Sequence, residues 1–451
     1  MMPEITRRKF VQLATGSAVA SCMGNMVAQQ PPAPEEPLWT PSDPPNTPIG
    51  QAKGIFPGRV TWVRDVRATP WDGKTGKWWE EKNINQEVLD RMFSRSLCAL
   101  TGTTTDKVAW EGLFRYFNRT HARGDQGYRP GERIAVKINV NNAYAGYHDA
   151  DNNIDASTHA VRALLRQLTG PGGVPQRDIT ICDPSPNGNQ RAISDRIYVP
   201  LHAEFPEVHW VDCQGKFGRE APAWVEGAIT YSSPETKLGS GLARCVVEAA
   251  YLINFALLKG HEISGVTLCA KNHFGSIRFP WLDHGKYVAP RNRSMDAQNG
   301  LVDLMGSPNL GGKTMLYIID GLYGTQTNVG NVTERDRWRR TFNGEWSASY
   351  FMSQDPVAID SVGLDFLRAE FQGDLGFSGA KQFPKGSIKN CDNYLHEAAR
   401  GSNAAFGPYK PNGVTVDSLG VHEHWNNPVD RKYSRNLSPG GKGIELFTVT
   451  G

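Results

Sequence analysis

Two lysines and two histidines lie close together in one stretch of the sequence, and side chains of these types can bind and act on an anion. They are Lys259, His261, Lys271 and His273. The first pair follows an apolar run with the length of a buried strand, 251–258, and the second follows an apolar, helix-compatible segment, 265–270. Burying a lysine costs several kcal/mol unless an anion or a carboxylate meets its charge. The doubled pattern therefore predicts a site for negative charge, although a lysine at the end of an apolar segment also commonly extends to water.

The elements that must position these residues form an alternation of strands and helices. Four apolar runs have the length of buried strands, at 133–140, 178–182, 251–258 and 314–319. Helical spacing marks residues 157–168 and a segment that contains Ile193, Ile197 and Leu201. This order implies parallel strands with right-handed crossovers. The sequence therefore predicts an α/β fold with a mainly parallel, Rossmann-like sheet flanked by helices, with irregular N- and C-terminal extensions.

Polar side chains follow each of the four predicted strands. They are Asn141 after the first strand, Asp183 after the second, Lys259 and His261 after the third, and Asp320 after the fourth. Ligands of open parallel sheets bind beyond the carboxyl ends of the strands, so we expect these side chains to converge. Lys137 lies inside the first strand, where its charge needs a partner. Asp and Asn also start turns and cap helices, which is the alternative explanation for any one of them.

Two further patterns concern the second half of the chain. Asp355 and Pro356 are a conventional start for a helix that we expect to reach Phe371, and capping alone explains the carboxylate. His422 and His424 point the same way if the backbone there is extended, a spacing that suits a metal ion. The histidines that could complete a divalent-metal site are His261, His273 and His284.

The N-terminal residues predict export. A twin-arginine pattern at 6–11 precedes a short apolar run, 13–20, and residues 19–22 resemble a lipobox in which Cys22 would carry a lipid anchor. Cleavage after Ala28 is the competing outcome. We expect a signal at 1–21, a proline-rich linker at 22–50, an α/β core domain at 51–370 and a loop-rich C-terminal extension packed on the core at 371–451. The predicted location is the periplasm or the cell envelope.

Composition narrows the choice of ligand. The formal net charge is only +3, part of which belongs to the signal, so nucleic acid is not an expected partner. None of the seven cysteines forms a CxxC pair, which argues against a zinc ribbon or an iron–sulfur cluster. Tryptophans are frequent between Trp62 and Trp110; they could stack on sugar rings or belong to the core.

Five motifs in this order resemble the bacterial and archaeal family catalogued as domain of unknown function 362. They are VKINVN (136–141), ICDPSP (181–186), INFALLKGHEISGVTLCAKNHFG (253–275), IIDG (318–321) and SQDPVAIDSVG (353–363). The resemblance covers about residues 133–368. The positions that it implies are Lys137, Asp183, Lys259, His261, Lys271, Asn272, Asp320, Asp355 and Asp360. Many relatives carry a ferredoxin-like module with clustered cysteines; this chain has none, so no iron–sulfur cluster is expected.

Three hypotheses for function follow. The first is an exported enzyme that acts on a small anionic or carbohydrate-derived substrate by proton transfer or hydrolysis, because histidine titrates near neutral pH and a buried lysine stabilises an oxyanion. Its catalytic residues would be His261, Lys259, Lys271 and His273, and its substrate-binding residues Lys137, Asn141, Asp183, Asn272 and Asp320. The second is a non-catalytic, membrane-tethered ligand-binding lipoprotein. The third is a metal-dependent redox protein, with His422 and His424 as metal ligands.

Overall fold

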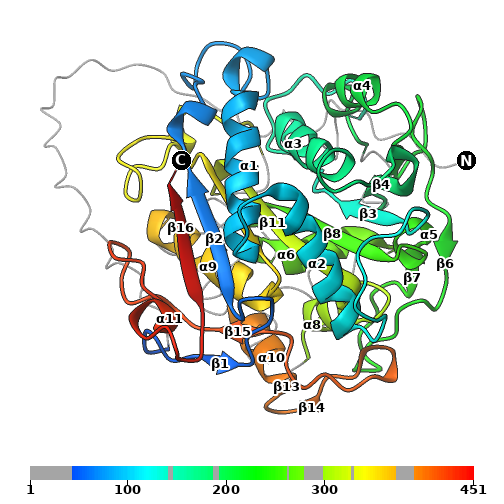
Figure 1. Cartoon of the computed structure of the whole chain (residues 1–451), viewed down its shortest axis with the longest axis vertical. Helices are drawn as coiled ribbons and strands as arrows, with labels where there is room; N and C mark the ends of the chain where they lie inside the picture. The colour runs from blue at the N-terminus through cyan, green and yellow to red at the C-terminus, as the bar shows by residue number, and fades with distance from the viewer. Residues whose placement is uncertain are drawn as a thin grey trace, which may run out of the picture. The chain divides into compact units, whose positions relative to one another are not determined.

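A mixed β-sheet forms the centre of the fold (Figure 1). The computed structural model of the chain describes residues 43–140, 146–185, 192–261, 264–278, 298–326, 330–371 and 391–450. Nine strands from these residues build the sheet: β2 (Arg59–Arg64), β3 (Ile134–Lys137), β4 (Ile179–Asp183), β5 (His209–Asp212), β8 (Tyr251–His261), β9 (Gly265–Thr267), β11 (Thr314–Thr325), β12 (Ser349–Ser353) and β16 (Glu445–Thr450). Their order is β16-β2-β12-β11-β8-β3-β4-β5, and β9 pairs with β8.

Most of the strand pairs are parallel. Strands β11, β8, β3, β4 and β5 form a continuous parallel half. Strand β12 is antiparallel to both β11 and β2, β16 is parallel to β2, and β9 folds back antiparallel to β8. Figure 1 shows β2 and β16 side by side at one edge, although they come from opposite ends of the chain. The predicted α/β fold with a mainly parallel sheet is confirmed.

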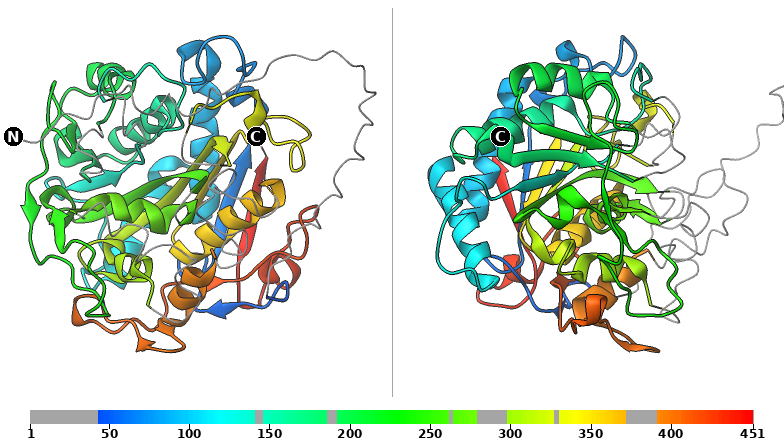
Figure 2. Two further views of the ribbon diagram at one scale, coloured as in Figure 1. Left: turned by 180° about the vertical axis from the view of Figure 1, so that it is seen from behind. Right: turned by 90° about the vertical axis from the view of Figure 1, so that its right-hand side faces the viewer.

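Helices cover both faces of the sheet (Figure 2). One face carries α1 (Gln86–Thr101), α2 (Asp106–Thr120), α3 (Thr158–Thr169) and α4 (Asp195–Glu204). The other carries α6 (Cys269–His273), α8 (Gly300–Gly306), α9 (Pro356–Phe371) and α10 (Asn393–Arg400). Strand side chains alternate between the two faces. Ile253 and Phe255 of β8 therefore pack in the core on the side of α1–α4, whereas Leu252 and Ala256 pack in the core on the side of α6 and α9.

Shorter elements lie around this framework. The two-stranded pair of β1 (Ile49–Gly50) and β15 (Val421–His422) joins the first described residues to the C-terminal part of the chain. A three-stranded sheet has the order β10-β7-β6, with bounds Ile277–Arg278, Gly241–Ala243 and Trp224–Val225. A second pair consists of β13 (Ser402–Asn403) and β14 (Gly407–Pro408), and the short helices are α5 (Arg244–Val247) and α11 (Ser434–Leu437).

Several predicted elements are confirmed, and one segment is corrected. Strands β3 and β4 and helices α3, α4 and α9 lie where the patterns place them. The segment 265–270, which we expected to be compatible with a helix, begins as strand β9, and only its last two residues belong to α6. Strands β8 and β11 extend to His261 and Thr325, so Lys259, His261 and Asp320 lie inside strands and not beyond their ends. The extra length comes from pairing along the β8–β9 hairpin and between β8 and β11.

Helices α1 and α2 lie in a region for which the sequence patterns predicted no helix or strand. Helix α1 starts at Asn85, whose side chain accepts a hydrogen bond from Val88 N at 3.2 Å, and it ends at Gly102, which has a φ of 68°. The tryptophans of this region are mostly core residues: Trp62, Trp71, Trp78 and Trp110 are buried. They are therefore not placed to stack on an external sugar ring.

Helix α9 is buried over almost its whole length, and Asp355 fixes its start. One carboxylate oxygen of Asp355 accepts hydrogen bonds from Val357 N at 3.0 Å and Ala358 N at 2.9 Å. The other accepts from Lys53 N at 2.9 Å and Val421 N at 3.2 Å. Asp355 thus caps α9, as predicted, and also ties this helix to the chain before β2 and to β15.

None of the helices in the described residues combines the length and the apolar character that a membrane span requires. The predicted signal, the lipobox and Cys22 lie outside the described residues.

We expect Asp355→Ala to lower the free energy of unfolding by more than about 2 kcal/mol. A lost helix cap costs up to about 2 kcal/mol, and each buried N–H left without an acceptor adds roughly 1–3 kcal/mol. Guanidinium denaturation measures the loss. Asn85→Ala is the matched control, because Asn85 caps α1 through a single backbone N–H, and we expect it to cost about 1 kcal/mol. Equal losses in the two variants would contradict the wider role of Asp355.

Candidate functional site

The carboxyl ends of β3 and β4 and the first half of β8 bring three buried polar side chains together. Lys137, the last residue of β3, is in register with Cys182 of β4 and with Asn254 of β8. Asp183 follows Cys182 at the end of β4. Two residues of α6, Asn272 and His273, pack against this edge. We call Lys137, Asp183, Asn254, Asn272 and His273 the carboxyl-edge cluster.

Lys137 is the centre of this cluster. Its Nζ lies 3.0 Å from Asp183 Oδ1, and it donates hydrogen bonds to Asn272 Oδ1 at 3.0 Å and to Ile138 O at 2.5 Å. The Lys137 side chain is completely buried. An ammonium group has three protons, and three acceptors inside the protein surround this one. Lys137 thus has the partner that the sequence required, and direct binding of substrate by Lys137 would have to displace one of these contacts.

Asn272 ties helix α6 to the sheet. Its Nδ2 donates hydrogen bonds to Lys137 O at 2.9 Å and to Asn254 Oδ1 at 2.8 Å. Asn254 in turn donates to Cys269 O at 2.9 Å. Asn254 was missed by the sequence analysis, although an amide inside the apolar run 251–258 is a signal that could have identified it, because a buried amide needs hydrogen-bond partners.

Gly275 allows the backbone to approach the ion pair. A Cβ atom at this position would lie 2.6 Å from Lys137 Nζ and 2.8 Å from Asp183 Oδ1. The carbonyl of Gly275 also accepts a hydrogen bond from Ser185 N at 3.1 Å, which joins the end of α6 to the residues after β4. Glycine is therefore the only residue that fits here without displacing the Lys137–Asp183 pair.

His273 is completely buried, and in the part of the chain that the structure describes neither of its ring nitrogens has a hydrogen-bond partner. Burial, followed by the nearby charge of Lys137, lowers the pKa of His273 to about 3. The imidazole is therefore neutral near pH 7. A neutral ring can donate one hydrogen bond and accept another, but it lacks the extra proton that a general acid transfers.

Three further buried polar groups near Gly275 have no hydrogen-bond partner within the described ranges of the chain. They are the hydroxyls of Ser185 and Ser276 and the side-chain oxygen of Asn139. Buried polar atoms are nearly always satisfied by protein, by ordered water or by a ligand. Such groups beside a buried lysine, at the edge where α/β proteins bind ligands, mark this edge as a site for a polar molecule.

Lys259 and His261 lie farther along the β8–β9 hairpin and on the other face of the sheet. Asn254 and Lys259 are five residues apart in one regular strand, which corresponds to about 16 Å. By strand alternation, Lys259 and His261 point to the face of Leu257, which packs with α1–α4, whereas Asn254 contacts α6. The predicted convergence of all strand-end residues is therefore corrected: the structure divides them into two groups.

Lys259, His261 and Asp320 form the second of these two groups. Asp320 is in register with Leu257. Asp320 accepts hydrogen bonds from Ser157 N at 3.2 Å, at the start of α3, and from Leu322 N at 3.1 Å. Burial raises the pKa of Asp320 to about 6, although these hydrogen bonds oppose the shift. His261 accepts a hydrogen bond from Ser264 N at its Nδ1, at 3.3 Å, which places the proton of the neutral ring on Nε2. Asn141 lies outside the described residues.

Lys271 lies on α6 and remains largely buried. Its Nζ is 4.3 Å from the centre of the Phe274 ring, a cation–π contact. Because Lys271 and Asn272 are adjacent on this short helix, the contacts of Asn272 with β3 and β8 also fix the backbone of Lys271.

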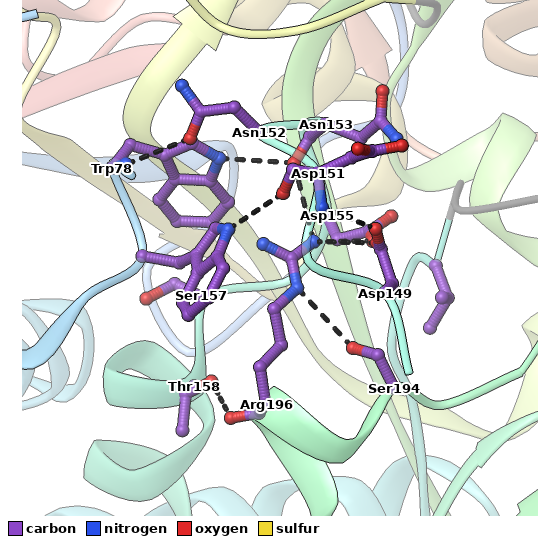
Figure 3. A network of polar contacts seen from close by, with 12 residues as sticks. Trp78, Asp149, Asp151, Asn152, Asn153, Asp155, Ser157, Thr158, Ser194 and Arg196 are labelled. Atoms are coloured by element: carbon purple, nitrogen blue, oxygen red, sulfur yellow. Dashed lines mark hydrogen bonds and ion pairs between the residues drawn. The ribbon is translucent and has the colours of Figure 1, made fainter. Parts of the chain in front are cut away.

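A buried arginine holds the chain segment that leads into α3 (Figure 3). Arg196 Nη2 lies 2.8 Å from Asp155 Oδ2 and 3.5 Å from Asp149 Oδ2. Trp78 Nε1 donates to Asn153 O at 3.1 Å, so this tryptophan braces the same segment. The network positions Ser157 and thereby the start of α3, to which Asp320 binds.

The two histidines predicted to bind metal lie elsewhere, beside α9. Both His422 and His424 are buried. Within the described part of the chain, ligand atoms of Asp43, His422 and His424 all lie within 4.8 Å of one another. The histidines considered as completing ligands are not in this group: His261 lies on β8, His273 lies on α6, and His284 is outside the described residues.

A cavity of about 290 Å³ opens at the opposite end of the sheet. Its lining includes Thr180 and His209, near the amino ends of β4 and β5, and Arg133, which precedes β3. We favour the carboxyl edge over this cavity, because buried polar atoms without partners gather at the carboxyl edge.

His273 should make stability depend on pH. Its pKa is about 3 in the folded chain and 6.5 in an unfolded one, so the unfolded state binds more protons between these values. Stability is therefore complete above pH 6.5 and is lost as the pH falls. We expect the difference in free energy of unfolding between the wild type and His273→Gln to change by about 1.4 kcal/mol per pH unit between about pH 6 and 4. Parallel stability profiles would contradict a buried, neutral His273.

Comparison with known proteins identifies the family of the chain. A search of curated proteins found no match to the chain. A family model described as domain of unknown function (DUF362) matches residues 134–365, which is more than half of the sequence and spans β3 to α9. The matched region includes the whole carboxyl-edge cluster, together with Lys259, His261, Lys271 and Asp320. The chain therefore belongs to the DUF362 family.

Proposed function

We propose that the protein is an enzyme that acts on a small anionic molecule at the carboxyl ends of the parallel strands, by proton transfer or hydrolysis. The observation that carries this proposal is the burial of Lys259, His261, Lys271 and His273 on one hairpin and its following helix. Buried cations at the ligand-binding edge of a parallel sheet favour an anion as the ligand.

The side chains have different roles in this proposal. In this proposal the bound molecule lies across the edge between the two groups: Lys271 supplies positive charge on the α6 side and Lys259 supplies it on the opposite face, for a carboxylate or phosphate or for an oxyanion that develops during the reaction. His261 transfers a proton, because histidine titrates near neutral pH and its ring is oriented by the hydrogen bond that Nδ1 accepts from Ser264 N. Asp320 has a pKa of about 6, which also suits a group that exchanges protons near neutral pH.

The carboxyl-edge cluster acts mainly by positioning. Lys137, Asp183 and Asn272 hold α6 against β3 and β8, which fixes the backbone that carries Lys271 and His273. His273 is neutral and donates or accepts a hydrogen bond from the bound molecule. We keep the expectation of an anionic substrate. The expectation that tryptophans stack on sugar rings loses its support, because Trp62, Trp71, Trp78 and Trp110 are buried.

We further propose, from the sequence of residues 1–42, that the protein reaches the periplasm or cell envelope by the twin-arginine route. A lipid anchor at Cys22 then provides its contact with a membrane. The expected partner is a small molecule and not a nucleic acid.

A screen of anions by thermal unfolding tests the proposal. Inorganic phosphate, sugar phosphates, uronic acids and small dicarboxylates are added to the purified chain, and samples with a positive result are assayed for product. We expect at least one anion to raise the Tm by about 2 °C or more, because a ligand at 100 times its Kd stabilises the native state by about 2.7 kcal/mol. Lys259→Met and Lys271→Met should abolish this rise.

Lys313→Met is the control, because Lys313 is a half-buried lysine that lies away from the proposed site. Its Nζ binds Val247 O at 2.7 Å at the other end of the sheet, before β11. This variant should keep the response to the anion. Stabilisation that survives both Lys259→Met and Lys271→Met would refute the location of the site. Stabilisation without product from any stabilising anion would refute catalysis and favour a ligand-binding protein.

A further inference from the structure

A further cluster of polar residues, buried except for the half-buried Asp43, lies on the α9 side of the pair formed by β1 and β15. We call it the histidine cluster; its members are Asp43, Asp392, His396, His422 and His424. The ring centres of His422 and His424 are 4.9 Å apart, and those of His396 and His422 are 4.6 Å apart. His396 Nε2 lies 2.7 Å from Asp43 Oδ2, and His424 Nε2 lies 3.6 Å from Asp392 Oδ2.

Helix α9 sets the orientation of His422. Ser361 donates its hydroxyl proton to Val357 O at 2.7 Å, and the same oxygen lies 2.8 Å from His422 Nδ1. Because the only proton of the hydroxyl is already used, Nδ1 must donate to Ser361. The Nε2 atom of His422 then carries a lone pair. This atom is buried and has no hydrogen-bond partner among the residues that the structure describes, and only 1% of the His422 surface is exposed.

The orientation of His424 is fixed in the same way one helical turn farther along. Its Nδ1 lies 2.7 Å from Asp365 Oδ1, and Asp365 Oδ2 accepts hydrogen bonds from Tyr433 OH at 2.9 Å and Trp425 N at 3.2 Å. A carboxylate that binds one ring nitrogen and turns the other toward a common point is the usual outer support of a metal-binding histidine.

We infer that His422, His424 and Asp43 bind a divalent transition-metal ion. The nearest ligand atoms of the three residues lie within 4.8 Å of one another, a spacing that allows one ion to contact all of them. Two imidazoles and a carboxylate are the ligand types of Zn²⁺, Fe²⁺ and Mn²⁺ sites. Asp392 and His396 lie beside the same point and are the neighbouring groups available to such an ion. This inference does not rest on the proposed anion site.

The arrangement of the histidine cluster favours the binding of a metal ion over a hydrogen-bond network that only stabilises the fold. A network without an ion would be expected to pair the buried Nε2 of His422, since an unsatisfied buried nitrogen costs about 1–3 kcal/mol. His422 lies on β15, and Ser361 and Asp365, which orient the two histidines, lie on α9; regular elements hold side chains more accurately than loops do.

The cluster is linked to the β8–β9 hairpin by a short series of contacts. Arg368 binds Asp392 Oδ2 at 3.1 Å and Cys391 Sγ at 3.3 Å. A Cβ atom on Gly265 would lie 2.6 Å from Cys391 Cβ, and Gly265 is paired with His261. Through these contacts, binding of a metal ion would affect the position of the β8–β9 hairpin, which carries Lys259 and His261.

Metal analysis of the purified full chain tests the inference. We expect close to one equivalent of zinc, iron or manganese by elemental mass spectrometry. After removal of metal with dipicolinate, added Zn²⁺ should raise the Tm, and added Co²⁺ should produce visible absorption. His422→Gln and His424→Gln should lose both responses, and Asp365→Asn should weaken Zn²⁺ binding by about 10- to 100-fold, as outer-support changes do.

His209→Gln is the control, because His209 is an exposed histidine on β5 that pairs with Glu220. It should keep the metal and both responses. The inference is overturned if the wild-type chain holds no metal and responds to neither ion, or if His422→Gln binds Zn²⁺ as tightly as the wild type. If His422→Gln or His424→Gln fails to fold, the Co²⁺ spectra of the wild type and Asp365→Asn decide: unchanged affinity in Asp365→Asn would contradict the site.

Discussion

A lysine and an aspartate that are both completely buried hold the carboxyl edge of the sheet together. Removing two charges from water costs several kcal/mol for each ion, and the cost is offset only where geometry and further hydrogen bonds are good. Both conditions hold for Lys137 and Asp183: their contact is 3.0 Å, Lys137 has two further acceptors, and Asp183 Oδ2 accepts from Val140 N at 2.7 Å. The ends of β3 and β4 and the helix α6 are therefore fixed by one interaction, and Gly275 is the residue that leaves room for it.

Helix α9 connects this edge with the histidine cluster. Asp360 accepts hydrogen bonds from the backbone N–H groups of Cys269 and Ala270, at 2.7 and 2.9 Å, and so holds the start of α6. One residue later Ser361 orients His422, and a turn farther Asp365 orients His424. The buried polar residues of the SQDPVAIDSVG motif thus have separate structural tasks, which capping alone did not reveal.

The sequence predicted four of the five strands in the parallel half of the sheet, because apolar strands and amphipathic helices alternate there in an order that only a few topologies satisfy, but it did not predict β5. It also identified Lys137 as a charge in need of a partner, and Asp183 at the next strand end. The face on which each residue lies was not predicted. Strand alternation turns Lys259 and His261 away from Asn254, and the length of β8, which sets their distance, depends on pairing with β9 and β11.

The remaining differences between the predicted and the observed structure come from contacts between residues that are distant in sequence. Strand β16 joins the sheet beside β2, and Asp43 joins His422 and His424, through contacts that no local pattern encodes. Helix α1 does carry apolar residues at helical spacing, including Leu89, Met92 and Phe93, but the many aromatic residues around it obscured the period. The sequence did indicate His422 and His424 as a pair, because they are only two residues apart.

A double-mutant cycle on Lys137 and Asp183 tests the central role of the ion pair most directly. The free energy of unfolding is measured for the wild type, Lys137→Met, Asp183→Asn and the double variant. Breaking a buried pair from one side costs about 3–5 kcal/mol, because the other charge is left without its partner. We predict that the double variant loses at least about 2 kcal/mol less than the sum of the single losses, within the range measured for directly interacting residues. Losses that simply add would contradict the account, since they would mean that the two residues stabilise the edge independently.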